Sequence, residues 1–197
     1  QDVFGHEKKT EVRDAEQREV SRHLDLLAGI YLVDDIEGWV PASRSPQRMR
    51  VSPKRYFADP SLGVALLRMS PERLLQDWQT FGMVFENLVI RDLLVYASAH
   101  PMASDHPVRY YRDDSNLEVD AIIELADGRW GACEIKLSHS KVEEGAKNLL
   151  MLQKKLLRDT QKRVEAPSFL AVIVGAGDAA YRRADGVFVI PIRTLGV

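Results

Sequence analysis

The segment Leu74–Ala99 constrains the fold more than any other part of the sequence, because it is long, helical in pattern and apolar at its centre. Residues 81–90 are Phe-Gly-Met-Val-Phe-Glu-Asn-Leu-Val-Ile, and Pro101 follows the segment as a helix stop. A helix that is apolar around its whole circumference has to be buried. We therefore predict one long helix that other layers of secondary structure cover on all sides.

Short alternating runs replace the helical pattern from Pro107 onward. The predicted elements are strands at Val108–Arg112, Leu117–Leu125 and Arg129–Leu137, a helix at Val142–Arg163, and strands at Phe169–Val174 and Val187–Ile192. Helices that alternate with groups of strands indicate an α/β class. The order predicts an α/β (α+β) sandwich in which helices flank a mixed central sheet.

The N-terminal part has a different pattern. Residues 1–17 are polar and are expected to be disordered or a remnant of a preceding domain, since the chain also starts without Met. From Arg18 the residues Val20, Leu24 and Leu27 mark one helical face that Gly29 ends. Ile30–Val33 and Trp39–Val40 then predict a short hairpin. A helix followed by a hairpin is the end of a winged helix, so we predict a partial winged helix and connector over residues 18–60.

Composition excludes several classes of protein. The 197 residues include 27 Lys and Arg against 29 Asp and Glu, so the chain is no polycation that binds nucleic acid by overall charge. No apolar run is long enough to span a bilayer, and the single Cys133 fits a reducing, cytoplasmic compartment. The chain also lacks a phosphate-binding loop, so we expect no ATP hydrolysis from it alone.

Basic residues gather at two places despite the balanced charge. Residues 41–58 contain no acid before Asp59, and a second group of bases extends over residues 154–163. The first group is either a solvated loop that leads into a short strand or a set of contacts to a phosphate backbone. Its candidate nucleic-acid contacts are Arg44, Arg48, Arg50, Lys54 and Arg55.

Glu86 is an unusual residue within the apolar helix. Its neighbours one turn before and after, Gly82, Met83, Val89 and Ile90, are all apolar. A carboxylate in such surroundings is desolvated unless a positive group compensates it, and such acids are candidates for functional sites. The alternative is that the helix leaves this position open to water.

Two carboxylates and a lysine occupy the neighbouring strands. Alternation places Leu117, Val119, Ala121 and Ile123 on one face and Glu118, Asp120, Ile122 and Glu124 on the other. In the next strand Trp130, Ala132, Glu134 and Lys136 share a face. Whether the acids meet depends on how the two strands are paired.

The length of the connecting loop sets that register. A two-residue turn at Asp127–Gly128 would place Asp120 opposite Ile135, with the acids facing apart. A three-residue loop, Ala126–Gly128 with Gly128 left-handed, places Asp120 opposite Glu134 and Glu118 opposite Lys136. We predict the three-residue loop, because two facing carboxylates make sense if a divalent cation lies between them.

The chemistry that suits these residues is hydrolysis of a phosphodiester. Asp120 and Glu134 are expected to bind Mg²⁺ or Mn²⁺, with the backbone carbonyl of Ile135 as a further ligand. Lys136 is expected to polarise the attacking water or to stabilise the developing charge, and Glu86 to add a metal or water contact. The alternative is a surface hairpin of mixed charges.

These residues resemble a known family. Phe85-Glu86-Asn87, Tyr110-Tyr111-Arg112, Glu118-Val119-Asp120 and Glu134-Ile135-Lys136 resemble the motifs of the PD-(D/E)XK nuclease-like fold. They resemble in particular the C-terminal domain of many prokaryotic AAA-type ATPases, in which a winged helix precedes that domain. The resemblance covers residues 18–197 and implies a restriction-endonuclease-like domain over residues 70–197. It also implies that Glu86, Asp120, Glu134 and Lys136 form the catalytic site.

Two functions follow from the sequence. The first is a divalent-metal-dependent endonuclease module acting on DNA, within an ATPase-linked protein whose ATP site lies in the missing N-terminal part. The second is a catalytically silent module that binds nucleic acid or protein and targets the ATPase. The expected partners are DNA and the ATPase domain of the full-length chain; no membrane is expected, and the oligomeric state stays open.

Overall fold

The computed structural model describes residues 19–41, 52–158 and 164–196. Residues 19–29 are helical and end at Gly29, as predicted. The elements that follow are β1 (Val33–Ile36), β2 (Lys54–Phe57), α2 (Pro60–Leu66), α3 (Pro71–Gln76), α4 (Trp78–Ser98), β3 (Ala103–Arg112), β4 (Glu118–Leu125), β5 (Trp130–Lys136), α5 (Val142–Arg158), β6 (Phe169–Val174), β7 (Tyr181–Arg182) and β8 (Phe188–Pro191). Short 3₁₀ turns follow β5 and β8.

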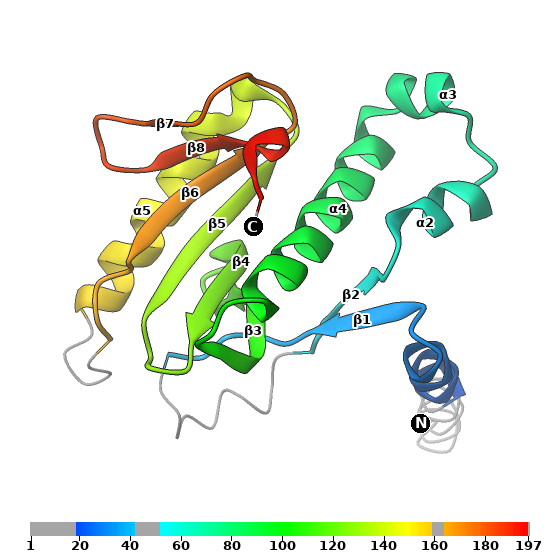
Figure 1. The fold of residues 1–197 in the computed structure, drawn as a ribbon, viewed down its shortest axis with the longest axis horizontal. Coiled ribbons are helices and arrows are strands. Elements are labelled where there is room, and N and C mark those ends of the chain that lie inside the picture. The colour runs from blue at the N-terminus through cyan, green and yellow to red at the C-terminus, as the bar shows by residue number, and fades with distance from the viewer. Residues whose placement is uncertain (1–18, 42–51, 159–163, 197) are drawn as a thin grey trace, which may run out of the picture.

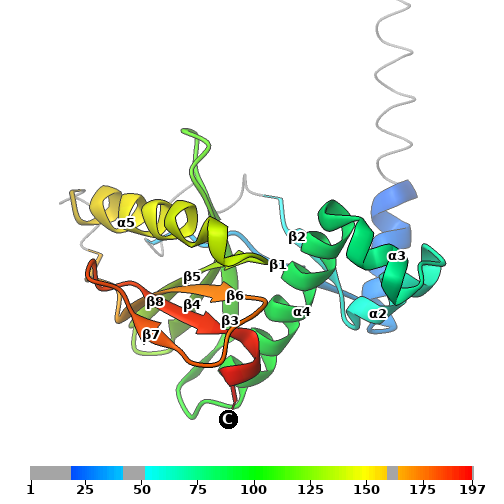
Figure 2. The ribbon, with the colours of Figure 1, turned by 90° about the horizontal axis from the view of Figure 1, so that it is seen from above.

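A mixed six-stranded sheet forms the centre of the molecule. Its order is β3-β4-β5-β6-β8-β7. The first three strands are antiparallel, β5, β6 and β8 run parallel, and β7 is antiparallel to β8. Helices α4 and α5 lie on opposite faces of this sheet (Figures 1 and 2). The predicted class, a mixed sheet flanked by helices, is confirmed.

Each face of the sheet has its own apolar core. Under α5, Leu149 and Leu152 are buried in one cluster with Val172 of β6. Under α4, Val89 and Ile90 are buried in a second cluster with residues of β3 to β6. No helix in the described residues has the length and apolar character needed to cross a membrane.

The long apolar helix differs from the prediction in two ways. It is interrupted at Asp77, whose carboxylate accepts a hydrogen bond from the Thr80 backbone amide and so caps the start of α4. The helix is also not covered on all sides, because Met83 is 58% exposed on the side that faces away from the sheet. Only the face with Phe85, Val89 and Ile90 meets the sheet, so the expectation of full burial was wrong.

The predicted hairpin between Ile30–Val33 and Trp39–Val40 was also wrong. Strand β1 pairs instead with β2, antiparallel, with Val33 opposite Phe57. Trp39 is used in the core: its backbone amide donates to the Tyr110 carbonyl at 2.6 Å, and its ring lies 4.9 Å from that of Trp130. Burying this indole in the core is more favourable than a tight turn after Val33, so Trp39 and Val40 do not fold back to pair with Ile30–Val33. The winged-helix assignment itself stays a prediction.

Candidate functional site

The β4–β5 hairpin has the predicted three-residue loop. Ala121 lies opposite Cys133, the Leu125 amide donates to the Arg129 carbonyl at 2.8 Å, and Gly128 has a φ of 87°. A left-handed residue at this position is the usual end of a three-residue hairpin loop. One further step along this register brings Asp120 opposite Glu134, so the acids meet and do not face apart.

A β-bulge in β4 lies at the position of the first acid. Between the pairs Arg109–Ile122 and Tyr111–Val119, β4 has one residue more than β3. The expected strict alternation is therefore wrong, since Val119 lies in the cluster under α5 and Ala121 in the cluster under α4. Bulges redirect side chains and are common beside active sites. This one accompanies a hydrogen bond in which the Ile135 amide donates to Asp120 Oδ2 at 2.8 Å.

Glu134, Lys136 and Asp120 form a compact charged group at the end of β5. Lys136 Nζ lies 2.6 Å from Glu134 Oε2 and 3.9 Å from Asp120 Oδ2. Glu134 is only 1% exposed, and Asn148 Nδ2 of α5 approaches its other oxygen at 3.4 Å. Gly145 makes room for this side chain, because a Cβ there would lie 3.3 Å from Glu134 Cβ.

The electrostatics of this group are unbalanced. Burial, with added repulsion from Asp120, raises the pKa of Glu134 to about 7. Burial also raises the pKa of Asp120, despite the attraction of Lys136, and Glu86 adds repulsion. Burial lowers the pKa of Lys136, but attraction to the two acids outweighs it and the net shift is upward. Two buried acids thus share one ammonium group, an arrangement that an added cation would stabilise.

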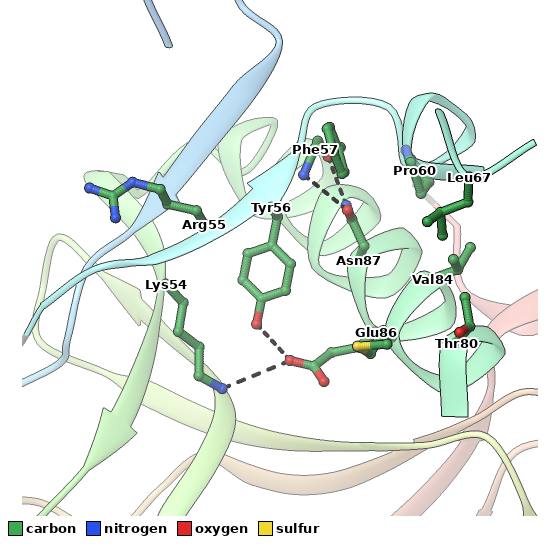
Figure 3. Close-up of a pocket in the computed structure, with 12 residues that line it drawn as sticks. Lys54, Arg55, Tyr56, Phe57, Pro60, Leu67, Thr80, Val84, Glu86 and Asn87 are labelled. Carbon is green, nitrogen blue, oxygen red and sulfur yellow. Dashed lines mark hydrogen bonds and ion pairs between the residues drawn. The ribbon is translucent and has the colours of Figure 1, made fainter. Parts of the chain in front are cut away.

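Glu86 lies beside this group on α4 and is held by residues of β2 (Figure 3). Tyr56 Oη donates to Glu86 Oε1 at 2.6 Å, and Lys54 Nζ lies 3.8 Å from the same oxygen. Burial first, and then the charge of Glu86, raises the pKa of Tyr56 well above its ordinary value, so the phenol stays a donor. The sequence left open whether Glu86 is compensated by a positive group or open to water. Both hold in part, because Glu86 is partly exposed and also lies beside the ammonium group of Lys54.

The ion pairs around Glu118 differ from the prediction. Its carboxylate pairs with Lys54 and, at 3.7 Å, with Arg112, whereas Lys136 pairs with Glu134. The predicted pair between Glu118 and Lys136 is therefore wrong, and Glu118 pairs with Lys54 and Arg112 in its place. Strand β2, which the sequence did not place beside the sheet, brings a second lysine to this position.

The hard oxygen donors needed for a divalent cation are only partly assembled. Among residues 19–41, 52–158 and 164–196, no three His, Cys, Asp or Glu side chains converge as a metal site. The Ile135 amide faces β4, since it donates to Asp120, and the carbonyl of the same residue in a regular strand points to the same edge. Asp120, Glu134 and this carbonyl thus fit the donor set of Mg²⁺ or Mn²⁺ as two acids and one carbonyl.

Of the basic candidates for nucleic-acid contact, the structure describes only Lys54 and Arg55. Arg44, Arg48 and Arg50 lie outside the described residues. Lys54 belongs to the site through Glu86 and Glu118, and Arg55 pairs with Asp35 of β1 at 3.1 Å. The predicted short strand after the basic loop is confirmed as β2.

The sequence analysis missed Tyr56 and Asn148. Period-two alternation in Lys54–Phe57 places Lys54 and Tyr56 on one face, so the pattern contains this signal once β2 is known to lie near α4. Asn148 is a neutral amide in α5, directly beside the buried Leu149. A polar amide next to a buried position is a signal that it serves a partner inside the protein.

A hollow of about 460 Å³ adjoins Glu86 on the side away from the sheet. It lies between β2, α2 and α4, and Figure 3 shows Phe57, Leu67 and Val84 among its mainly apolar walls. Asn87 at its base uses both ends of its amide, donating to the Phe57 carbonyl at 2.7 Å and accepting from the Phe57 amide at 2.9 Å. These bonds attach β2, and with it Tyr56 and Lys54, to α4.

Family models match two stretches of the chain. A family model described as "Domain of unknown function (DUF4143)" matches residues 81–195, which include Glu86, Asp120, Glu134 and Lys136. A second, described as "Domain of unknown function (DUF8612)", matches residues 7–73. No curated protein and no solved structure matches the chain.

Proposed function

The chain belongs to the DUF4143 family, whose domain is found at the C-termini of AAA-ATPase-like proteins, and on this premise we propose that it is a divalent-metal-dependent nuclease module acting on DNA. The observation that supports the proposal is the crowding of Asp120 and Glu134 around the single ammonium group of Lys136. Two buried acids that repel each other lower the stability of the folded protein, which is why such pairs are candidates for functional sites.

Each residue has a separate role in the proposed reaction. Asp120, Glu134 and the Ile135 carbonyl would hold Mg²⁺ or Mn²⁺. When bound, the metal supplies a Lewis acid and lowers the pKa of a water molecule. Lys136 donates hydrogen bonds to the phosphate oxygens on which negative charge develops. Glu86, oriented by Tyr56 and Lys54, accepts a hydrogen bond from the attacking water.

One observation favours a second function, that of a catalytically silent module which binds nucleic acid or protein and targets its ATPase. Glu134 and Glu86 are already paired with Lys136 and Lys54 of their own chain. In this second function the lysines neutralise the acids permanently, and the site has only a structural role.

Metal binding and strand cleavage distinguish the two functions. The protein would be titrated with Mn²⁺ by calorimetry and then incubated with supercoiled plasmid and Mn²⁺. The variants are Asp120→Asn, which removes one proposed metal ligand, and Asp178→Asn, which removes the same charge from a highly exposed residue. We expect metal binding and nicking for the wild type and for Asp178→Asn, and loss of both for Asp120→Asn.

The second function makes the opposite prediction. If the wild type and Asp120→Asn behave alike in both assays, the acids are not a metal site and only the binding function remains. Binding without nicking would retain the metal site and exclude the nuclease.

A further inference from the structure

A basic groove runs along α5 beside the acidic site. It is a hollow of about 530 Å³ between α5 and the loop that joins β3 to β4. We call it the α5 groove, and its relevant lining residues are Asn116, Asn148, Met151, Lys154, Lys155 and Arg158. In Figure 2 this hairpin of β3 and β4 extends past α5. The proposed catalytic residues are not part of the groove.

One cation of the groove fixes its outer wall. Lys155 Nζ lies 2.5 Å from Asp113 Oδ2 and 3.0 Å from Ser115 Oγ of the β3–β4 loop. Burial raises the pKa of Asp113, but hydrogen bonds from Lys155, Ser115 and Tyr111 outweigh it and hold that pKa well below its ordinary value. The loop is therefore attached to α5 by an ionised pair. Lys154 and Arg158 are exposed and face the hollow.

The groove is continuous with the acidic site through Asn148. This side chain lines the groove and also approaches Glu134 Oε1 at 3.4 Å. From Asn148 to Arg158 the helix rises by about 15 Å, at about 1.5 Å per residue. That distance equals about four nucleotides of one strand, at about 3.4 Å each. Met151, between the two ends, offers an apolar contact for a sugar.

We propose that the α5 groove binds the phosphate backbone of a DNA strand and directs that strand toward the acids. Lys154 and Arg158 contact successive phosphates, and Asn148 marks the end at which the strand reaches Glu134. The ligand is DNA, and not an acidic protein, because the groove is elongated and leads to residues suited to phosphodiesters. For its ligand the proposal rests on the proposed function, whereas backbone binding requires neither metal nor cleavage.

The test measures binding of a short fluorescein-labelled DNA duplex by anisotropy, in EDTA and at several salt concentrations. The groove variant is Lys154→Gln with Arg158→Gln. The matched control is Arg73→Gln with Arg193→Gln, which removes the same charge from exposed residues of α3 and of the turn after β8. Circular dichroism melting checks that both variants are folded.

The expected result is a change in the salt dependence of the groove variant alone. Each lost phosphate contact reduces the slope of log K against log salt by about 0.9, so the double variant should lose about 1.8. Equal slopes for the groove variant and the control would overturn the proposal. It would also be overturned if unlabelled polyglutamate displaced the duplex as readily as unlabelled DNA did at the same concentration of charge.

Failure of this proposal differs from failure of the nuclease proposal. Asp178→Asn, which removes a charge from an exposed residue outside both the groove and the acidic site, should retain the wild-type affinity and salt slope in EDTA. If the groove variant loses its slope while no protein nicks plasmid, the groove is a DNA site and the acids are not catalytic. If nicking depends on Asp120 but the slope is unchanged, DNA reaches the acids by another surface.

Discussion

At the scale of single residues, Glu134 links the proposed site to the stability of the metal-free protein. Its pKa is raised from 4.5 to about 7 in the folded state. Between these values the folded protein binds more protons than the unfolded chain does. The free energy of unfolding therefore falls as pH rises through this range. The contribution of Glu134 to stability is present below about pH 4.5 and is lost as pH rises past 7.

Glu134→Gln should remove this loss, because glutamine keeps the size of the side chain and cannot ionise. We expect the metal-free variant to be more stable than the wild type at pH 8, by up to about 3 kcal/mol. At pH 5 the difference should fall below about 1 kcal/mol, because the acid of the folded wild type is protonated and its ionisation in the unfolded chain has only begun to lower stability. Urea unfolding in EDTA at both pH values measures it. Glu165→Gln is the control, since its side chain is exposed and should change little at either pH. A glutamine variant that is less stable at pH 8 would show that Lys136 compensates Glu134 fully.

At the same scale, the pairing of Asp120 with Glu134 could be predicted because it depends on local information. Alternation within each strand and the position of Gly128 were enough to choose the register. The bulge at Asp120 could not be predicted in this way. It arises because β4 has one residue more than β3 between two of their pairs, and the register of that pairing is not visible in the pattern of β4 alone. Tyr56 was missed for the same reason, because its partner Glu86 is 30 residues further along the chain.

At the scale of elements, the hairpin loop is the feature on which the site depends. Gly128 has a φ of 87°, in the region that side chains with a Cβ rarely adopt. Gly82 in α4 has no atom near the position that a Cβ would occupy, and its helical backbone suits alanine. Replacement by alanine is therefore expected to change stability in opposite directions at these two glycines.

Gly128→Ala should destabilise the protein by about 1–2 kcal/mol, because alanine is strained in the left-handed region. Gly82→Ala should stabilise it by about 0.5–1 kcal/mol, because alanine loses less conformational entropy in a helix. Thermal unfolding followed by circular dichroism compares both with the wild type. Equal shifts in the same direction would mean that the loop does not require its left-handed residue.

The elements themselves could be predicted where the pattern was local. Strand β6 has the predicted bounds, Phe169–Val174, because a short run of apolar and β-branched residues is typical of a buried strand. Helix α2 and the two-residue strand β7 were not predicted, since each is short and carries little periodic signal. The prediction of the strand that pairs with β1 was wrong. Strand β2 is separated from β1 by a long segment, and pairing over such a distance leaves no local pattern in the sequence.

At the scale of the whole molecule, the N-terminal segment contributes to the same core as the sheet. Trp39 is 3% exposed and lies against Trp130 of β5. Strand β2 is attached to α4 by the two hydrogen bonds between Phe57 and Asn87. The sequence suggested a division between residues 18–60 and residues 70–197. These contacts cross that division and supply part of the proposed site, namely Lys54 and Tyr56.

We therefore expect the described chain to unfold in one transition, and Asn87→Leu to shift it. The variant leaves the Phe57 amide and carbonyl without their partner, which should destabilise the protein by about 2–3 kcal/mol. Tryptophan fluorescence should change mainly through the buried Trp39 and Trp130, since Trp78 is 66% exposed in the folded protein. This signal and far-ultraviolet circular dichroism should move together to lower urea, as two-state unfolding requires. Gln79→Leu, on an exposed position of α4, should leave both curves near the wild type. If the two probes separate, or if Asn87→Leu shifts only one of them, residues 18–60 unfold as an independent unit. Lys54 and Tyr56 would then reach Glu86 only when that unit is docked.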